Sequence, residues 1–250
     1  MPEWFTYAKA RASFAQVGND MDAYQLYNTY SIGSDPNGNT TAGQGKTKYD
    51  ADVRSELITS WEAGAELKFF NNRLGVDFAW YKTNAKRQLM NIPLNNLSGY
   101  DNMKVNAGNI QNTGIEIMLN ARPIETAQFS WDTQLNFSQN KSKIIELLPG
   151  KPGMQYALGG SDALQVYAVA GGAYGEIWGT KYQRVEEGEF KGQLLLNESG
   201  LPQATSDKHK IGEQQPDFLL GWTNTFNYKN FTLSFLIDGR FGGDISHSPI

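Results

Sequence analysis

Side chains that could carry out covalent or metal chemistry are sparse in this sequence. It contains no cysteine and two histidines, His209 and His247, which fall in different predicted loops. Zinc is usually held by thiolate, imidazole and carboxylate ligands, so a metal site here would need carboxylates beside these histidines. The closest-spaced carboxylates, Glu186, Glu187 and Glu189, flank a glycine in a predicted loop and are typical of solvated charges. The sequence therefore predicts no metal site and no cofactor.

Paired carboxylates can also do general acid–base work, and Glu62 and Glu66 are the pair to consider. Their positions on a predicted strand separate them by about 13 Å, at about 3.3 Å per residue. The two carboxylates of a glycosidase lie closer, about 5–10 Å apart. No GxSxG, P-loop or GxGxxG motif occurs, and residues 171–175 have the wrong glycine spacing for one. We therefore predict a protein that is not an enzyme, with no catalytic residues.

The sequence around Glu62 and Glu66 has a period of two. Apolar and polar residues alternate through WEAGAELKFF, pause at the polar residues 71–73, and resume in RLGVDFAW. Alternate residues of a β-strand point to opposite faces, so the segment predicts a long hairpin with one apolar and one charged face. The apolar face would carry Trp61, Ala63, Ala65, Leu67, Phe69, Leu74, Val76, Phe78 and Trp80.

The same alternation predicts seven long strands along the chain, interrupted at Asn224, which falls on an apolar face. The predicted strands are residues 4–17, 58–70, 73–90, 109–121, 128–139, 217–228 and 231–240. Short turns and long loops alternate between them. The turns are residues 71–73, 122–127 and 228–230, and the loops are about 18–57, 91–107 and 140–216. This arrangement is typical of an outer-membrane β-barrel, with short turns at one end and long loops at the other.

In such a barrel the apolar face contacts lipid and the polar face lines the lumen. The charged residues predicted to face the lumen are Lys9, Arg11, Glu62, Glu66, Lys68, Asp77, Glu116, Asp132, Asp238 and Arg240. Aromatic residues crowd the predicted short turns, as they do in the girdle at a membrane interface. The predicted girdle residues are Trp4, Phe69, Phe70, Phe129, Trp131, Tyr228 and Phe231.

The composition of the chain excludes some functions and folds. The chain has 250 residues, a net charge of −4 and no cluster of Lys and Arg, which argues against nucleic-acid binding. No run of about 18 apolar residues predicts a membrane-spanning helix. Two other structures remain open, a soluble extracellular β-sandwich that binds glycans and a small complete outer-membrane barrel. Strands of about 10–15 residues, well above the usual 5–6, favour a transmembrane barrel over the sandwich.

Several motifs resemble one family. NAGNIQNTGIE (106–116) resembles the NxGxIxNxGxE motif in the barrels of SusC-like TonB-dependent transporters of Bacteroidota. KARASFAQVGND (9–20) and TSWEAGAELKFFNNRLGVDFAWY (59–81) resemble two further elements of that family. Other matching segments follow in the same order and cover most of the chain outside loops 21–57 and 150–170. They are residues 131–147, 175–179 and 227–243.

The resemblance implies an all-β fold, an antiparallel transmembrane β-barrel of about 22 strands. The family's N-terminal plug and its last strand have no counterpart in this sequence, so residues 1–250 are expected to be a partial barrel domain. The resemblance further implies an outer-membrane location, with lipid around the barrel, and import of an oligosaccharide or peptide. The implied partners are a SusD-like surface lipoprotein and the TonB complex, which would act through the missing N-terminal part. Binding and gated translocation would need no covalent chemistry.

Overall fold

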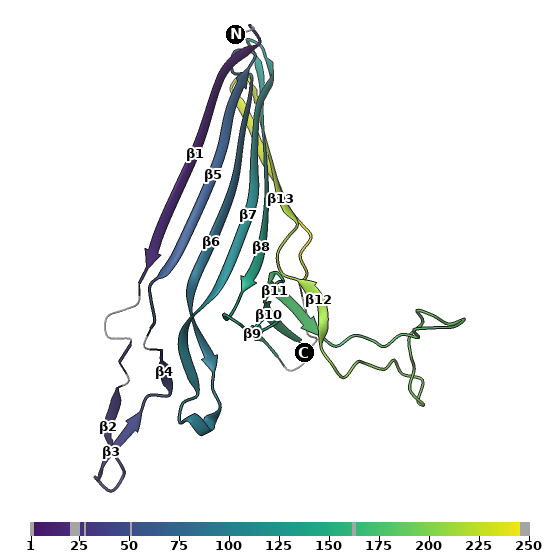
Figure 1. Cartoon of the computed structure of the whole chain (residues 1–250). Coiled ribbons are helices and arrows are strands. Elements are labelled where there is room, and N and C mark those ends of the chain that lie inside the picture. Colours follow the sequence, from purple (N-terminus) through teal and green to yellow (C-terminus); the bar gives the residue numbers. More distant parts are fainter. Residues whose placement is uncertain (1–2, 21–25, 28, 51, 162–163, 246–250) are drawn as a thin grey trace.

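The computed structural model describes residues 3–20, 26–27, 29–50, 52–161 and 164–245, and it is an all-β structure with one short 3-10 helix in that part of the chain (Figure 1). None of the helical structure in these ranges is long and apolar enough to cross a membrane. The elements are β1 (Phe5–Asn19), β2 (Tyr30–Ser34), β3 (Thr40–Gln44), β4 (Thr47–Tyr49), β5 (Glu56–Phe69), β6 (Leu74–Pro93), η1 (Asn96–Ser98), β7 (Asn102–Glu125), β8 (Phe129–Glu146), β9 (Gln155–Gly160), β10 (Leu164–Val169), β11 (Tyr174–Gly179), β12 (His209–Glu213), β13 (Phe218–Tyr228) and β14 (Phe231–Phe241).

Seven long strands form the main sheet in the order β1-β5-β6-β7-β8-β13-β14, and every neighbouring pair is antiparallel. Strands β6 and β7 contain 20 and 24 residues, far above the usual length of about 5–6. The short strand β4 pairs in parallel with the beginning of β7. The predicted antiparallel β structure, with its seven long strands, is therefore confirmed.

The connections of the main sheet differ between its two ends. The short turns gather at the end drawn uppermost in Figure 1, whereas the long connections lie at the other end. The turn after β5 holds Phe70, Asn71 and Asn72 at positive φ values of 51°, 54° and 67°. Asparagine tolerates this left-handed conformation better than most residues, and so the chain can reverse within a few residues.

Strands β7 and β8 extend further than the sequence pattern predicted. The predicted strand 109–121 falls inside the observed strand 102–125, and the predicted strand 128–139 ends seven residues before the end of the observed strand 129–146. Alternation fails beyond the predicted ends because Gly108, at φ 83°, breaks the regular strand there. Its backbone N–H is nevertheless bonded to Leu147 O at 2.7 Å, so the sheet continues.

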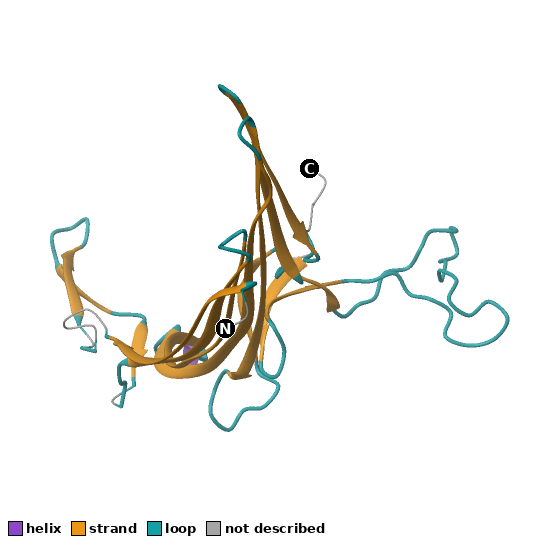
Figure 2. Ribbon diagram, turned by 90° about the horizontal axis from the view of Figure 1, so that it is seen from above, coloured by secondary structure: helices purple, strands orange, loops and turns teal. Residues whose placement is uncertain are grey.

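The predicted loop 140–216 also contains regular structure. Strands β9 to β12 form a separate four-stranded sheet in the order β12-β11-β10-β9. This sheet joins the end of β8 through two backbone hydrogen bonds, Ile144 N to Gly172 O at 2.9 Å and Gly171 N to Ile144 O at 2.8 Å. A small core of Ile144, Leu147 and Ala168 is buried at this junction. Residues 180–208 then leave the sheet as a narrow arm (Figures 1 and 2).

The loop between β1 and β5 is attached to the extended β6–β7 hairpin through Asn106. The Asn106 amide nitrogen donates to Arg54 O at 2.7 Å and to Arg87 O at 2.8 Å. Its amide oxygen accepts a hydrogen bond from Arg54 N at 2.5 Å. The first asparagine of the NAGNIQNTGIE motif therefore joins a distant loop to the sheet.

We expect Asn106→Ala to loosen the loop around Arg54, because the two hydrogen bonds between Asn106 and Arg54 are lost and each is worth about 1 kcal/mol. In the full-length protein, amide hydrogen exchange at Arg54 should quicken by about tenfold or more, while exchange in the paired part of β6 stays unchanged. The matched control is Asn91→Ala, at an exposed site two strand positions beyond Leu89 on the same hairpin. Equal protection of Arg54 in both variants would contradict this role of Asn106.

Candidate functional site

The register of the main sheet places all ten predicted lumen residues on one of its faces. Residues that pair directly across an antiparallel sheet share a face. One cross-strand row runs from Arg11 through Gly64, Ala79, Glu116, Ser138 and Leu219 to Arg240. The next row contains Lys9, Glu66, Asp77, Met118, Asn136, Gly221 and Asp238. Glu62, Lys68 and Asp132 lie in further rows of the same face, which we call the charged face.

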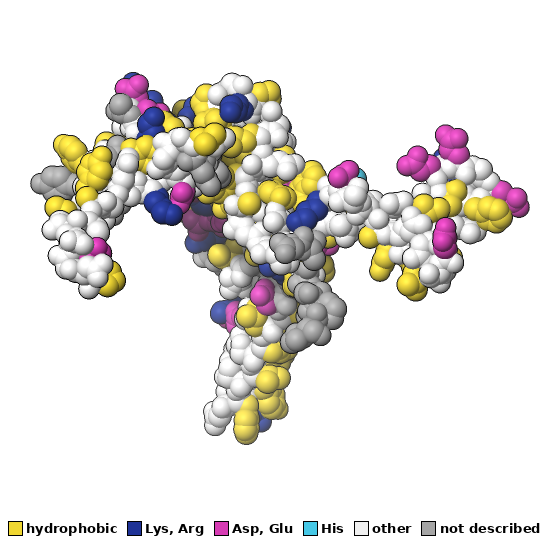
Figure 3. All heavy atoms as spheres, turned by 90° about the horizontal axis from the view of Figure 1, so that it is seen from below, with side chains coloured by type: hydrophobic (Ala, Val, Ile, Leu, Met, Phe, Trp, Pro, Cys, Tyr) yellow, Lys and Arg dark blue, Asp and Glu magenta, His cyan; other side chains and the backbone are white. Residues whose placement is uncertain are grey.

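The charged face is the hollow side of a curved sheet. Arg11 on β1 and Asp238 on β14, the first and last strands, line the same open cavity of about 510 Å³. Asp77 and Glu116 line it between them. The bend of the sheet is visible end-on in Figure 2, and charged side chains gather in its hollow in Figure 3. A concave polar face opposite an apolar face is the arrangement that a barrel wall with a hydrated lumen requires.

Most charges of this face are paired within the sheet. Arg11 binds Asp77 with two hydrogen bonds, of 2.7 and 3.0 Å, and its Nε lies 3.6 Å from Glu62 Oε1. Lys68 Nζ lies 3.1 Å from Glu66 Oε1. A bidentate arginine–carboxylate pair fixes both side chains in position as well as neutralising them. Within the described part of the chain, Glu116 and Asp238 form no ion pair, and neither do Lys9 and Arg240, so the unpaired charges of this face are of both signs.

Two glycines of the sequence motifs make room for long side chains on the charged face. Arg11 lies across Gly64, where a Cβ atom would come within 2.8 Å of the guanidinium and 2.7 Å of Phe78 O. Tyr81 lies across Gly114, where a Cβ would meet the phenol oxygen and lie 2.5 Å from Gln139 O. Beyond the glycine, the Tyr81 hydroxyl donates to Asn140 Oδ1 at 3.2 Å. Each long side chain thus connects strands on either side of a glycine.

The predicted girdle residues lie at the short-turn end of the sheet. Trp4 stacks on Phe69 with centroids 5.9 Å apart, and Trp131 and Phe129 both stack on Phe226. Phe70 is exposed in the turn after β5, and Tyr228 pairs with Phe231 where β13 meets β14. Their exposed rings lie where a girdle is expected, and their contact with a membrane interface stays a prediction.

Asn224 interrupts the apolar pattern of β13, and its hydrogen bond to a tryptophan indole explains its presence there. Its side chain is 1 % exposed, and its Oδ1 accepts a hydrogen bond from Trp131 Nε1 at 2.9 Å. Trp222 makes a similar bond to Thr133 Oγ1, also at 2.9 Å. Buried indole N–H groups usually find an acceptor, so these polar residues serve the tryptophans of the apolar face. Asn224 pairs with Thr133, and each of the two indoles reaches its acceptor diagonally across the β8–β13 pair.

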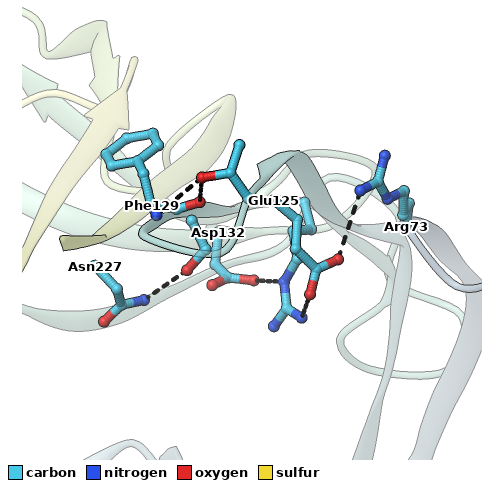
Figure 4. A network of polar contacts seen from close by, with 8 residues as sticks. Arg73, Glu125, Phe129, Asp132 and Asn227 are labelled. Atoms are coloured by element: carbon cyan, nitrogen blue, oxygen red, sulfur yellow. Dashed lines mark hydrogen bonds and ion pairs between the residues drawn. The ribbon is translucent and has the colours of Figure 1, made fainter. Parts of the chain in front are cut away.

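A polar network holds the turns at the same end (Figure 4). Arg122 Nε binds Asp132 at 2.6 Å and Arg122 Nη1 binds Glu125 at 3.2 Å, while Arg73 lies 3.6 Å from Glu125. Asp132 shares the charged face as predicted, but it is neutralised by Arg122 and helps to fix the β7–β8 turn. The network therefore couples that turn to the preceding β5–β6 turn.

A second charged cluster lies outside the main sheet. Glu176 on β11 is 5 % exposed and accepts hydrogen bonds from Lys210 Nζ at 3.0 Å and Trp178 Nε1 at 3.0 Å. Burial acts to lower the pKa of Lys210, but its hydrogen bonds to Glu176 and Glu213 outweigh this and raise the pKa above its ordinary value. The cluster stabilises the pairing of β11 with β12 and shows no substrate-binding geometry.

No group of three or more His, Asp or Glu side chains within the described ranges is arranged to hold a metal ion. His209 begins β12 and lines a wide cavity in the arm, whereas His247 lies outside the described residues. Glu186, Glu187 and Glu189 belong to the exposed arm.

Substituting Ala for Gly114 should destabilise the folded protein by about 1–3 kcal/mol, because the added methyl group overlaps Tyr81 and the Gln139 carbonyl. Gly75→Ala is the matched control on the same face, since its methyl group would lie 3.9 Å from the nearest atoms. Urea unfolding of the full-length protein in detergent measures both. Equal unfolding midpoints for the two variants would rule out the packing role of Gly114.

The two faces can be distinguished by single cysteines, since this chain has none of its own. We expect Met118→Cys and Asn136→Cys, on the charged face, to react with a charged, membrane-impermeant thiol reagent. Their neighbours Ile117→Cys and Phe137→Cys point the other way and should react only with a lipid-soluble maleimide. Labelling of all four positions by the charged reagent in intact membranes would refute a lipid-facing apolar side.

Curated TonB-dependent receptors are similar to this chain over nearly its whole length. It is 28 % identical over 260 residues to TonB-dependent receptor P3 of Formosa agariphila, covering 95 % of this chain and 26 % of that protein. It is 29 % identical over 235 residues to TonB-dependent receptor SusC of Bacteroides thetaiotaomicron, covering 88 % of this chain and 23 % of that one. The chain thus spans about a quarter of the length of these curated relatives.

Solved structures show the same fold. The RagAB peptide importer in its closed-closed state superposes with a TM-score of 0.76 at 18 % identity, covering 97 % of this chain and 27 % of that one. The family model described as TonB dependent receptor-like, beta-barrel, matches residues 2–239, well over half of the sequence. With its antiparallel sheet, its SusC-like motifs and its two-faced strands, this chain is a segment of an outer-membrane barrel and belongs to the TonB-dependent receptor β-barrel family.

Proposed function

We propose that this segment forms part of the wall and outer loops of a SusC-like importer that takes up oligosaccharides or peptides. The observation that carries the proposal is the concave charged face, which opposes an apolar face along the same strands. Such a sheet separates lipid from a hydrated interior, and the family match supports transport through that interior. Residues 1–250 would then be a partial barrel domain, with seven of about 22 strands.

The charge pattern supports a large, polar and weakly charged substrate. The ten predicted lumen residues comprise four basic and six acidic side chains, and the closest of them form ion pairs. Pairing cancels most of the field that a solute would meet, while amide and hydroxyl groups such as Asn136 and Ser138 remain available for hydrogen bonding. An oligosaccharide or a peptide backbone suits this wall. The RagAB importer, which shares the fold, is named for peptides.

The proposed partners act at the two ends of the barrel. A SusD-like lipoprotein would cover the long outer loops, where the arm exposes apolar side chains such as Tyr182, Phe190 and Leu201. The TonB complex would supply energy through parts of the protein beyond these residues. The import cycle would consist of binding and gated translocation with no covalent step, in keeping with relatives named as receptors.

Uptake measurements test this function. Bacteria that lack the full-length protein should lose uptake of labelled oligosaccharides or of labelled peptides, while growth on monosaccharides and amino acids remains normal. The intact gene should restore uptake in a strain with TonB and fail to restore it in a strain without TonB. Tagged protein extracted in mild detergent should also carry a surface lipoprotein with it. Uptake that survives the loss of TonB would overturn the proposal.

A further inference from the structure

We propose that Lys82, Lys86, Lys141 and Lys143 form a binding site for the phosphorylated headgroup of an outer-leaflet glycolipid. These four residues, which we call the lysine patch, lie on the outward face of the sheet, opposite the charged face. The site rests on the outer-membrane location of the barrel and is independent of the proposed substrate.

The register fixes the position of the lysine patch relative to the apolar band. On β1, β5, β6, β7 and β8 the continuous run of outward apolar residues ends at a polar residue, although Leu57 lies outward again further along β5. On β13 and β14 the outward face stays apolar to Phe218 and Phe241. The last apolar residues are Phe14 on β1, Trp61 on β5, Trp80 on β6, Ile115 on β7 and Phe137 on β8. The outward positions that come next are Gln16, Thr59, Lys82, Thr113 and Gln139. This boundary lies at the long-loop end of the sheet, away from the girdle at the short turns.

The end of the apolar run shifts from strand to strand. Phe14, Trp61, Lys82, Thr113 and Lys141 form one cross-strand row. In this row β1 and β5 are still apolar, whereas β6 and β8 already carry lysine. The continuous apolar run thus ends one row earlier on β6 and two rows earlier on β8 than on β1 and β5. Lys82 and Lys141 accordingly lie just beyond the hydrocarbon boundary.

The lysines are close enough together to act on one headgroup. Lys82 and Lys141 are two strands apart in one row, about 10 Å at the usual spacing. Lys143 follows in the next row with Asn84 and Gln111, and Lys86 in the row after that, beside Asn109 and Glu146. None of the four lysines forms an ion pair within the described ranges, and Glu146 is the acidic side chain that shares their rows.

A depression lies at the same place. Its volume is about 410 Å³, and its lining includes Lys82, Lys86, Asn84, Gln111 and Trp61. The Trp61 ring is 55 % exposed and packs against Phe14 with centroids 4.5 Å apart, so an aromatic pair borders the depression on its apolar side. Amide donors and ammonium groups together match the oxygens of a phosphorylated sugar, and the apolar band below matches its acyl chains.

The lysines thus stand out against the charges of the opposite face. Arg11 and Lys68 are neutralised by carboxylates, whereas the lysine patch has an uncompensated positive charge at a lipid boundary. Basic side chains at such a boundary attract anionic headgroups, and each adds to the affinity. The charge and the adjoining apolar band favour an anionic amphiphile over a soluble anion, which would gain nothing from that band.

The test uses the full-length transporter purified in non-ionic detergent, with lipid A as the probe and native mass spectrometry as the readout. The patch variant is Lys82→Gln, Lys141→Gln and Lys143→Gln combined. The control variant combines Lys151→Gln, Lys191→Gln and Lys208→Gln, which removes the same charge from loop positions. We expect lipid A binding to weaken on the order of 10–100-fold in the patch variant and to stay unchanged in the control.

Two further arms identify the source of the anion. Dephosphorylated lipid A should bind the wild-type protein as weakly as lipid A binds the patch variant, and inorganic phosphate should not displace bound lipid A. A Lys→Arg triple variant at the same positions keeps the charge and should retain binding, which separates loss of charge from misfolding. Unchanged lipid A binding in the patch variant overturns the proposal, as does displacement by phosphate alone. A changed oligomeric state with unchanged lipid binding would assign the lysine patch to a protein contact and also overturn it.

Discussion

Backbone hydrogen bonding is the constraint on which the rest of this structure depends. A backbone amide or carbonyl in hydrocarbon has no water to bond, so a sheet that crosses a membrane must be paired along its length. The pairing of β6 with β7 runs from Leu74–Ala121 to Pro93–Asn102. The outer edges of β1 and β14 have no partner strand in the described residues. In lipid these edges require neighbouring strands, which agrees with a chain that spans about a quarter of its relatives' length.

Curvature of the paired sheet creates crowding on its concave face. Long side chains there cannot extend straight inward without meeting others, and they lie across neighbouring strands instead. Arg11 crosses Gly64 to reach Asp77, and Tyr81 crosses Gly114 to reach Asn140. The glycines of the two sequence motifs are thus explained by the side chains that cover them. At these two glycines, the motifs that resemble the family have their physical basis in packing of the barrel wall.

The period-two pattern was sufficient to predict the long strands and to sort charged from apolar positions, because one face of the sheet is apolar over most of the length between the short turns and the lysine patch. The pairs on the charged face were not predictable, since Arg11 and Asp77 are 66 residues apart and meet only through the register of three strands. The sheet of β9 to β12 was missed because it lies beyond the apolar band, where no one-sided environment imposes alternation. Asn224 broke the pattern for a local reason, as the acceptor of the Trp131 indole.

Most charged side chains are paired on the concave face of the sheet, whereas the lysine patch on its outward face is unpaired within the described residues, and the different surroundings of the two faces explain this difference. On the concave face basic and acidic residues neutralise one another, as in Arg11 of β1 with Asp77 of β6 and Lys68 with Glu66 on β5. Ion pairing on this face weakens the electrostatic field at its surface, so a polar solute is not held tightly there. On the outward face Lys82 and Lys141 occur where the apolar band ends, without carboxylates in their own row. Carboxylates would be repelled by an anionic membrane surface, so at the proposed site lipid headgroups would neutralise the lysines, where neighbouring side chains do so on the concave face.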